Sequence, residues 1–122
     1  MNDYRVTFVN ERDAPTVADQ PRVEVASWRV VRAANGDWHL LAILASGSLR
    51  VTSRIVNFDP VARELTTESK RAYRLLNPPE DRQLQHELLR ANASRVGLGE
   101  AADISSDLWS LVKGLSPDLE SV

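Results

Sequence analysis

Residues 22–56 decide the fold and read RVEVASWRVVRAANGDWHLLAILASGSLRVTSRIV. The first part, residues 23–32, is rich in β-branched and aromatic side chains, which favours a long strand. Its alternation changes phase near Ala26-Ser27, so a bulge or bend is expected there. Asn35-Gly36 tolerates the positive φ angles of a tight hairpin, and this pair predicts a turn into the next strand.

Two further strands are predicted in the rest of this stretch. Residues 38–45 are nearly all apolar, which is typical of a central strand covered on both faces. Ser46-Gly47-Ser48 then predicts a turn. Residues 49–55 alternate between apolar and polar side chains, so we expect a core face and a basic, solvent-facing side that carries Arg50 and Arg54.

The segments on either side extend the strand pattern. Residues 4–9 alternate with period 2 and predict a first strand, separated by a loop from residue 22. After a turn over residues 58–62, short strands are expected at 63–68 and 71–76. The strand block thus predicts an antiparallel meander of about six strands, as a strongly curved sheet or a small barrel.

The pattern changes to a helical one at Asn77-Pro78. Asn77 is a good helix cap, Pro78 fits the first helical position, and Glu80 stands where it completes a capping box. We expect Leu84, Leu88 and Ala91 to mark the inward face of this helix, with Leu89 and Val96 widening it, and the helix to end at Gly97.

A shorter helix is expected over residues 106–113, with Leu108, Leu111 and Val112 inward and Trp109 anchoring it to the sheet. The sequence therefore predicts one α+β domain over residues 1–114, with strands in 3–76 and helices in 77–114. Residues 115–122 are expected to be a flexible tail.

Composition restricts the class of protein. The chain has 122 residues, of which 43% are hydrophobic and 26% charged, as is typical of a single globular domain. It contains no cysteine, which excludes disulfides, thiolate nucleophiles and cysteine-ligated zinc. The formal net charge is −2, but residues 22–77 hold nine Lys/Arg and five Asp/Glu, a balance of +4. This basic middle suits either the acidic flanks of the chain or an anionic partner.

No sequence motif indicates a catalytic, metal-binding or cofactor-binding site. His39 and His86 both lie outside any metal-ligand or catalytic spacing. His39 is expected to be a hydrogen-bonded or edge-exposed strand residue, and His86 to lie on the solvent face of the helix. Serines and glycines form neither a nucleophile elbow nor a phosphate-binding loop. We therefore expect no catalytic residue, no metal, no cofactor and no enzymatic activity.

Two surfaces are candidates for binding. The first is basic with one aromatic side chain, and such a surface suits a protein partner or single-stranded nucleic acid. Its members are Arg50, Arg54, Lys70, Arg71, Tyr73 and Arg74. The second consists of Trp28 and Trp38, which flank the Asn35-Gly36 turn. Packing of these two rings in the core or on the sheet is the favoured interpretation, with a cross-strand pair as one form of it, and exposure of either would indicate a partner surface.

One group of hairpin residues resembles a known class of proteins. It comprises Arg50-Val51-Thr52-Ser53-Arg54-Ile55, Asp59, Leu65-Thr66-Thr67-Glu68-Ser69 and Tyr73-Arg74-Leu75. These residues resemble hairpins in small uncharacterised bacterial proteins carried on phages, plasmids and gene cassettes. The resemblance implies an accessory protein that acts by binding, and it supplies no catalytic residues.

The leading hypothesis is a non-enzymatic accessory protein that binds a protein partner or forms a homodimer. It predicts an exposed apolar patch on the sheet. The alternatives are single-stranded nucleic-acid binding through the basic face of residues 49–76, and small-molecule binding in a cavity between sheet and helix. The N-terminal residues lack the basic and apolar order of a signal peptide and no membrane span is expected, so we expect a cytoplasmic location.

Overall fold

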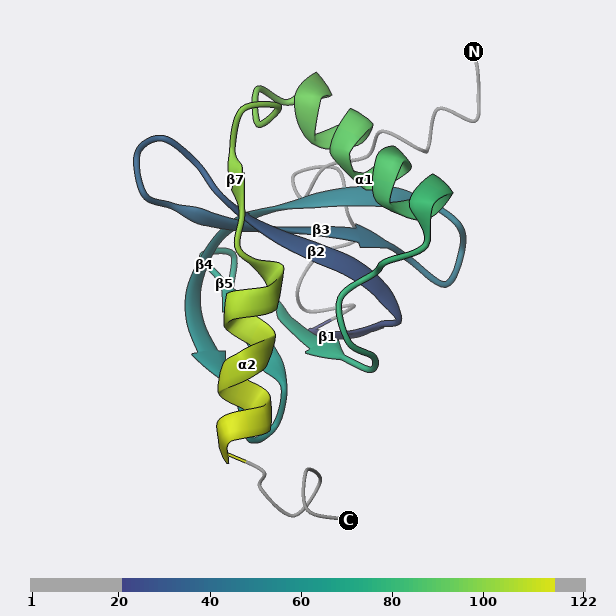
Figure 1. The fold of residues 1–122 in the computed structure, drawn as a ribbon. Coiled ribbons are helices and arrows are strands. Elements are labelled where there is room, and N and C mark those ends of the chain that lie inside the picture. The colour runs from purple at the N-terminus through teal and green to yellow at the C-terminus, as the bar shows by residue number, and fades with distance from the viewer. Residues whose placement is uncertain (1–20, 116–122) are drawn as a thin grey trace.

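The protein, described by a computed structural model over residues 21–115, is an α+β fold of seven strands and two helices in that range (Figure 1). In chain order the elements are β1 (Arg22–Val25), β2 (Ser27–Arg32), β3 (Trp38–Ile43), β4 (Leu49–Asp59), β5 (Glu64–Thr67), β6 (Ala72–Leu75), α1 (Gln83–Arg95), β7 (Ala102–Asp103) and α2 (Ser105–Leu115). The strand predicted at residues 4–9 lies outside the described residues. So does the predicted tail, except for Leu115, which belongs to α2.

The strands form one sheet in the order β1-β6-β5-β4-β3-β2-β7. Every pairing is antiparallel except the one between β1 and β6. The sheet is neither closed nor strongly curled, so the expected strongly curved sheet or barrel is wrong. The long strand predicted over residues 23–32 does break at Ala26, as expected. Its two parts meet end to end there, and the outer edge of β2 pairs with β7, so no ladder joins β1 to β2 within residues 21–115.

Strand β4 belongs to two ladders. Its first part, residues 49–54, pairs with β3, whereas residues 55–59 pair with β5 on the opposite side. The register shifts once in each ladder, so β4 carries two irregularities along its length. Phe58 and Asp59 end this strand, although the sequence placed them in a turn. The turn itself follows, because the Asp59 carboxylate accepts hydrogen bonds from the backbone N–H groups of Val61 and Ala62 at 3.0 and 3.2 Å.

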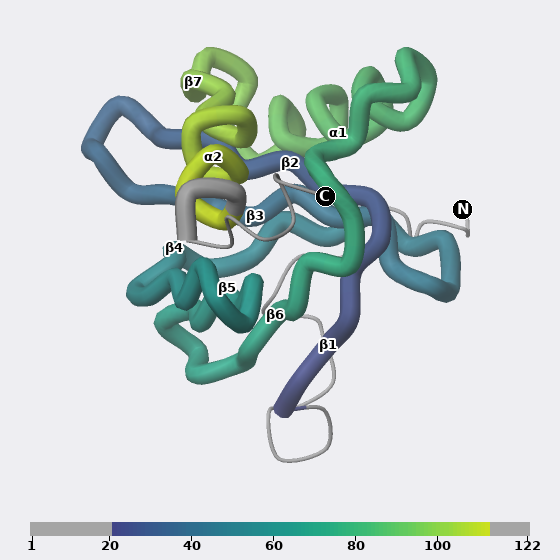
Figure 2. The backbone as a smooth tube through the Cα atoms, turned by 60° about the horizontal axis from the view of Figure 1, so that its bottom comes forward, coloured from purple at the N-terminus to yellow at the C-terminus, as the bar shows by residue number. Residues whose placement is uncertain are grey.

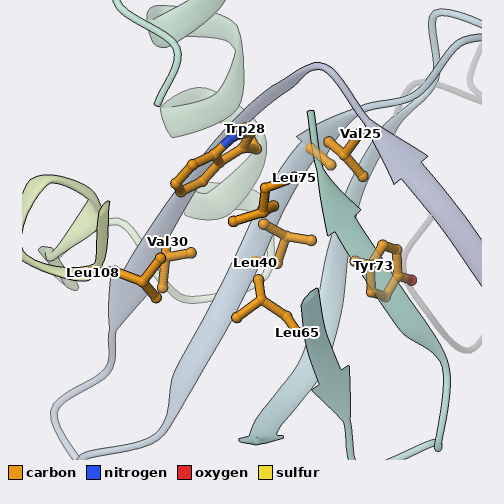
Figure 3. Packing of buried hydrophobic residues seen from close by; sticks show 9 residues of the cluster. Val25, Trp28, Val30, Leu40, Leu65, Tyr73, Leu75 and Leu108 are labelled. Atoms are coloured by element: carbon orange, nitrogen blue, oxygen red, sulfur yellow. The ribbon is translucent and has the colours of Figure 1, made fainter. Parts of the chain in front are cut away.

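The two helices pack on opposite faces of β2 and β3. Val31 and Leu41 belong to the cluster that includes Leu89 and Ala93 of α1. Their chain neighbours Val30 and Leu40 belong to the cluster that includes Leu108 of α2, and Figure 3 shows Leu108 beside Val30. Since successive residues of a strand point to opposite faces, β3 is covered on both, as predicted.

The predicted hairpin turns are confirmed. Gly36 has a φ of +93°, and the Ala33 N–H donates to the Asp37 carbonyl at 2.8 Å across the β2–β3 turn. Gly47 has a φ of +92° in the turn between β3 and β4. Both angles are costly for a residue with a Cβ atom, which explains glycine at these positions.

The predicted start of the first helix is wrong. Helix α1 begins at Gln83, and its cap, Arg82, makes no side-chain capping bond. Asn77 and Glu80 have other partners, because the segment between β6 and α1 runs beside the bend between β1 and β2 (Figure 2). The Asn77 side chain donates to the Ala26 carbonyl at 3.1 Å, and the Glu80 N–H donates to the Trp28 carbonyl at 2.9 Å.

Only the Leu89 side of the face predicted for helix α1 packs against the sheet. Leu84 and Leu88 are 63% and 42% exposed, whereas Leu89 and Ala93 are buried. The small side chain of Ala93 lets the helix lie close over the strands. The helix ends at Arg95, and Gly97, with a φ of +85°, follows as the predicted stop.

Candidate functional site

Half of the predicted basic surface lies inside the protein. Arg50, Arg71 and Tyr73 are 4%, 2% and 0% exposed. Arg50 projects into the core beside Tyr73, and its Nη1 donates to the tyrosine hydroxyl at 3.3 Å. The solvent-facing position expected for Arg50 is therefore wrong, and Tyr73 cannot stack on a nucleic-acid base in this arrangement.

The other three predicted residues are exposed but separate. Arg54 is paired with Glu68 across the β4–β5 ladder, with Nε and Oε2 3.4 Å apart. Arg74 lies in register between Glu24 and Glu64 on the neighbouring strands. Lys70 is exposed in the β5–β6 turn. Acidic residues on neighbouring strands thus lie opposite Arg54 and Arg74. The three exposed residues do not form one basic surface.

The two predicted surface tryptophans have different environments. Trp28 is fully buried and opposite Ala42, so it does not pair with Trp38, which is opposite Arg32. The cross-strand pair of Trp28 and Trp38 is therefore wrong, because the register places each of them opposite another residue. The ring of Trp28 instead packs against Trp109 of α2, with centroids 5.9 Å apart and planes inclined by 52°. This contact confirms the anchoring role predicted for Trp109.

His39 has the structural role predicted for it. Its Nδ1 lies 3.0 Å from the Thr52 carbonyl oxygen, at the irregularity between β3 and β4. The Thr52 hydroxyl accepts a hydrogen bond from the Leu40 N–H at 3.1 Å, where the regular ladder is interrupted. Both polar side chains therefore satisfy backbone groups at this bulge.

His86 comes close to a carboxylate that sequence reasoning did not connect with it. Its Nε2 lies 3.7 Å from Asp103 Oδ2, which also accepts a hydrogen bond from Arg29 Nε at 2.9 Å. Burial raises the pKa of Asp103, but the bonds from Arg29 and Ser105 outweigh this and lower it below its ordinary value. An ionised Asp103 thus joins α1, β2 and β7. Neither of the two hollows described below is lined by His86.

Glu80 is the second carboxylate with a shifted pKa. Hydrogen bonds from the Arg82 side chain hold the pKa of Glu80 at about 2, against the desolvation that raises it. Glu80 Oε1 also accepts a bond from the Ser27 hydroxyl at 2.5 Å. The hydrogen bonds from Ser27 and from nearby Arg82 explain the lowered pKa of Glu80. They indicate that this carboxylate has a structural, anchoring role. Within residues 21–115, His, Asp and Glu do not form any group of three that could hold a metal.

An apolar groove lies where β4, the start of β3 and α2 meet. Its volume is about 470 Å³, within the range of about 300–1,000 Å³ that is usual for ligand-binding pockets. We refer to it as the β4–α2 groove. It is lined by Trp38, Ile55, Val56, Asn57, Phe58, Pro60 and Leu111.

Two apolar side chains of the β4–α2 groove face solvent. Val56 is 49% exposed and Leu111 is 51% exposed. The register shift between Ile55 and Asn57 leaves Val56 without a partner residue on β5. On α2, Leu108 and Val112 are buried while Leu111 points away from the core, contrary to the inward position expected for it.

A second hollow of about 230 Å³ lies at the β1–β6–β5 side of the sheet. It is lined by Arg22, Ala62, Glu64 and Arg74. Arg22 Nε and Glu64 Oε2 form an ion pair of 2.9 Å there. Because the Arg22–Glu64 ion pair already occupies it, this hollow is a weaker candidate for a binding site than the β4–α2 groove.

Of the groove residues, the sequence predicted only Trp38 as part of a surface. The others were hidden for two reasons. Phe58 and Pro60 were assigned to a turn, and Leu111 was assigned to the core by helical spacing. One sequence feature did point to the groove. Val56 is an apolar residue that follows Ile55 and breaks the alternation of the strand.

No helix among residues 21–115 is long and apolar enough to cross a membrane. Comparisons with protein-family models, with curated proteins and with solved structures found no match to this chain. The resemblance to accessory proteins of mobile elements therefore stays a prediction.

Proposed function

We propose that this protein is a non-enzymatic binding module whose β4–α2 groove takes a segment of a protein partner. The observation that carries the proposal is the exposure of Val56 of β4 and Leu111 of α2 in the lining of one apolar groove. Half-buried Trp38 and Phe58 belong to the lining and also pack against the core, which holds these two rings in place. Of these side chains, tryptophan is the one that is enriched in binding hot spots.

The composition of the groove favours a peptide segment. Its lining offers one amide, Asn57, among apolar side chains, which suits an apolar partner fixed by few polar contacts. The groove lies between sheet and helix, as the small-molecule alternative requires. Two apolar side chains of its lining, Val56 and Leu111, nevertheless face solvent. The nucleic-acid alternative has no such support, because Arg50, Arg71 and Tyr73 are buried. We place the module in the cytoplasm as part of this proposal.

The proposal is tested with a phage-displayed library of random peptides of about twelve residues. Peptides selected on the full chain are synthesised, and their dissociation constants are measured by fluorescence polarisation. Leu111→Asp introduces a carboxylate into the apolar wall and is expected to weaken binding at least about tenfold, since desolvating that charge opposes binding.

The matched control is Leu84→Asp. Leu84 is also an exposed leucine on a helix, but it lies on α1 and outside the β4–α2 groove. This variant is expected to bind the same peptides as the parent protein. Failure to select any peptide, or equal losses in both variants, would contradict the proposed function.

A further inference from the structure

Within residues 21–115, the peptide groups of one paired residue of β4 point away from its ladder partner, and the ladders identify that residue as Phe58. In the β5–β6 ladder the Thr67 N–H donates to the Arg71 carbonyl at 3.0 Å. Hydrogen-bonded pairs recur at every second residue of an antiparallel ladder, so the next such pair is Leu65 with Tyr73. The peptide groups of Leu65 therefore face β6 and not β4.

Phe58 is the residue of β4 opposite Leu65. Because Leu65 directs its peptide groups to β6, the N–H and C=O of Phe58 must point to the other side of β4. On that side β3 begins only at Trp38, and its last pairing with β4 is that of His39 with Arg54. Among the described residues no strand runs beside Phe58 on this side.

Among the residues that the structure describes, no other group replaces the missing strand. Within residues 21–115, the backbone bonds of turns and loops and the side-chain bonds leave the N–H and C=O of Phe58 without a partner. An unpaired strand edge is a ready template for another strand. Here that edge opens onto an apolar groove, where the side chains of an added strand would be buried.

The charges beside the groove specify the flanks of its occupant. Asp37, Asp59 and Asp107 each lie close in sequence to a residue of the lining. Arg54, which adjoins the same strand segment, is already paired with Glu68. Arg32 is opposite Trp38, and Lys113 lies two residues after Leu111, so three acidic and two basic residues adjoin the lining in sequence or register. This small negative balance favours a basic residue on the occupant.

We propose that the β4–α2 groove binds an extended apolar peptide segment with a basic flanking residue, added as an antiparallel strand to Phe58. This inference rests on the proposed function. One residue of the peptide, which we call the paired residue, exchanges two backbone hydrogen bonds with Phe58. In an antiparallel pair its side chain points to the same face as that of Phe58, and so into the groove. Antiparallel addition continues the direction of β3 along β4.

The test is an N-methyl scan of a library-selected peptide on the full chain. Methylation of the paired residue removes the N–H that the Phe58 carbonyl accepts, and it is expected to weaken binding at least about tenfold. Methylation of the residues on either side is expected to be tolerated, since their N–H groups point away. Alanine at the paired residue is expected to weaken binding as well, because its side chain fills the groove.

A charge test accompanies the scan. Exchanging the basic flanking residue of the peptide for Glu is expected to weaken binding several-fold at low salt, and less at high salt. Asp107→Asn is expected to reduce this salt dependence. The matched control Asp81→Asn removes an exposed carboxylate outside the groove and is expected to leave it unchanged.

The outcomes separate this inference from the proposed function. A peptide that loses affinity with Leu111→Asp but tolerates every N-methyl group would overturn strand addition and leave the binding module intact. A peptide that is insensitive to Leu111→Asp would overturn both. Self-association of the chain that Leu111→Asp abolishes would show that a second copy fills the groove, which also overturns the inference.

Discussion

The two parts of β4 have the same strand conformation and different surroundings. Residues 49–54 pair with β3, and the first four of them are buried, including the polar Arg50 and Thr52. Residues 55–59 pair with β5, but among residues 21–115 no strand covers their other edge beside Phe58. We call them the closed part and the open part. The difference arises because β3 starts only at Trp38, and it shows that neighbouring strand ends decide where this strand can bind.

The largest expected effect contrasts the two parts directly. Val51 in the closed part is 5% exposed, and Val51→Asp buries a charge, so the free energy of unfolding is expected to fall by more than about 4 kcal/mol. Val56→Asp in the open part is expected to change it by less than about 1 kcal/mol while peptide binding is lost. Urea unfolding measures the first effect and fluorescence polarisation the second. Similar destabilisation by both variants would remove the distinction between the parts.

The next prediction concerns the cation inside the closed part. Arg50 is buried, and within the described residues its Nε has no hydrogen-bond partner. Arg50→Met keeps most of the volume and removes the desolvated charge, so stability is expected to stay equal or to rise. Arg50→Ala leaves a cavity and is expected to cost about 2–4 kcal/mol. If Arg50→Met lowered the free energy of unfolding as much as Arg50→Ala, the charge itself would stabilise the closed part.

Acid should loosen the segment that joins β6 to α1 beside β2. The folded pKa of Glu80 is about 2, below its ordinary value of 4.5. Its stabilising contribution is therefore complete above about pH 4.5 and is lost as the pH falls towards 2. Glu80→Gln is expected to lower stability by about 2 kcal/mol at neutral pH and to have less effect at acid pH.

Urea unfolding over this pH range measures the difference between the Glu80→Gln variant and the parent protein. A difference that stays constant with pH would contradict the anchoring role of the ionised carboxylate.

The smallest effect is expected at the junction of the two parts. Arg54 and Glu68 are 45% and 59% exposed and their charged atoms are 3.4 Å apart. A double-mutant cycle with alanine is expected to give a coupling energy below about 1 kcal/mol, and high salt should remove it. A coupling of several kcal/mol would mean that this ion pair, and not the end of β3, fixes where β4 opens.

Local signals carried the predictions that succeeded. The Asn35-Gly36 turn, the bend at Ala26 and the stop at Gly97 each depend on the φ angles or phase of a few neighbouring residues. The double coverage of β3 followed from its continuous apolar sequence.

The predictions that failed depended on distant partners. The capping role of Asn77 was overridden by its hydrogen bond to Ala26, which lies 51 residues earlier. Arg50 alternates like a solvent-facing residue, and only the packing of the core beside Tyr73 shows that it is buried. The β4–α2 groove depends on where β3 starts relative to β4, which composition and periodicity do not encode. The sequence therefore predicted the α+β class and most elements but not the candidate site.

Amide hydrogen exchange of β4 in the free, full-length chain tests the central claim most directly. The Asn57 N–H faces β5 and is expected to exchange at least about ten times more slowly than the Phe58 N–H, which faces the open edge. Addition of a selected peptide is expected to slow the exchange of Phe58 and to leave Asn57 unchanged. Equal protection of both amides before any peptide is added would contradict the account, because the edge would already be occupied.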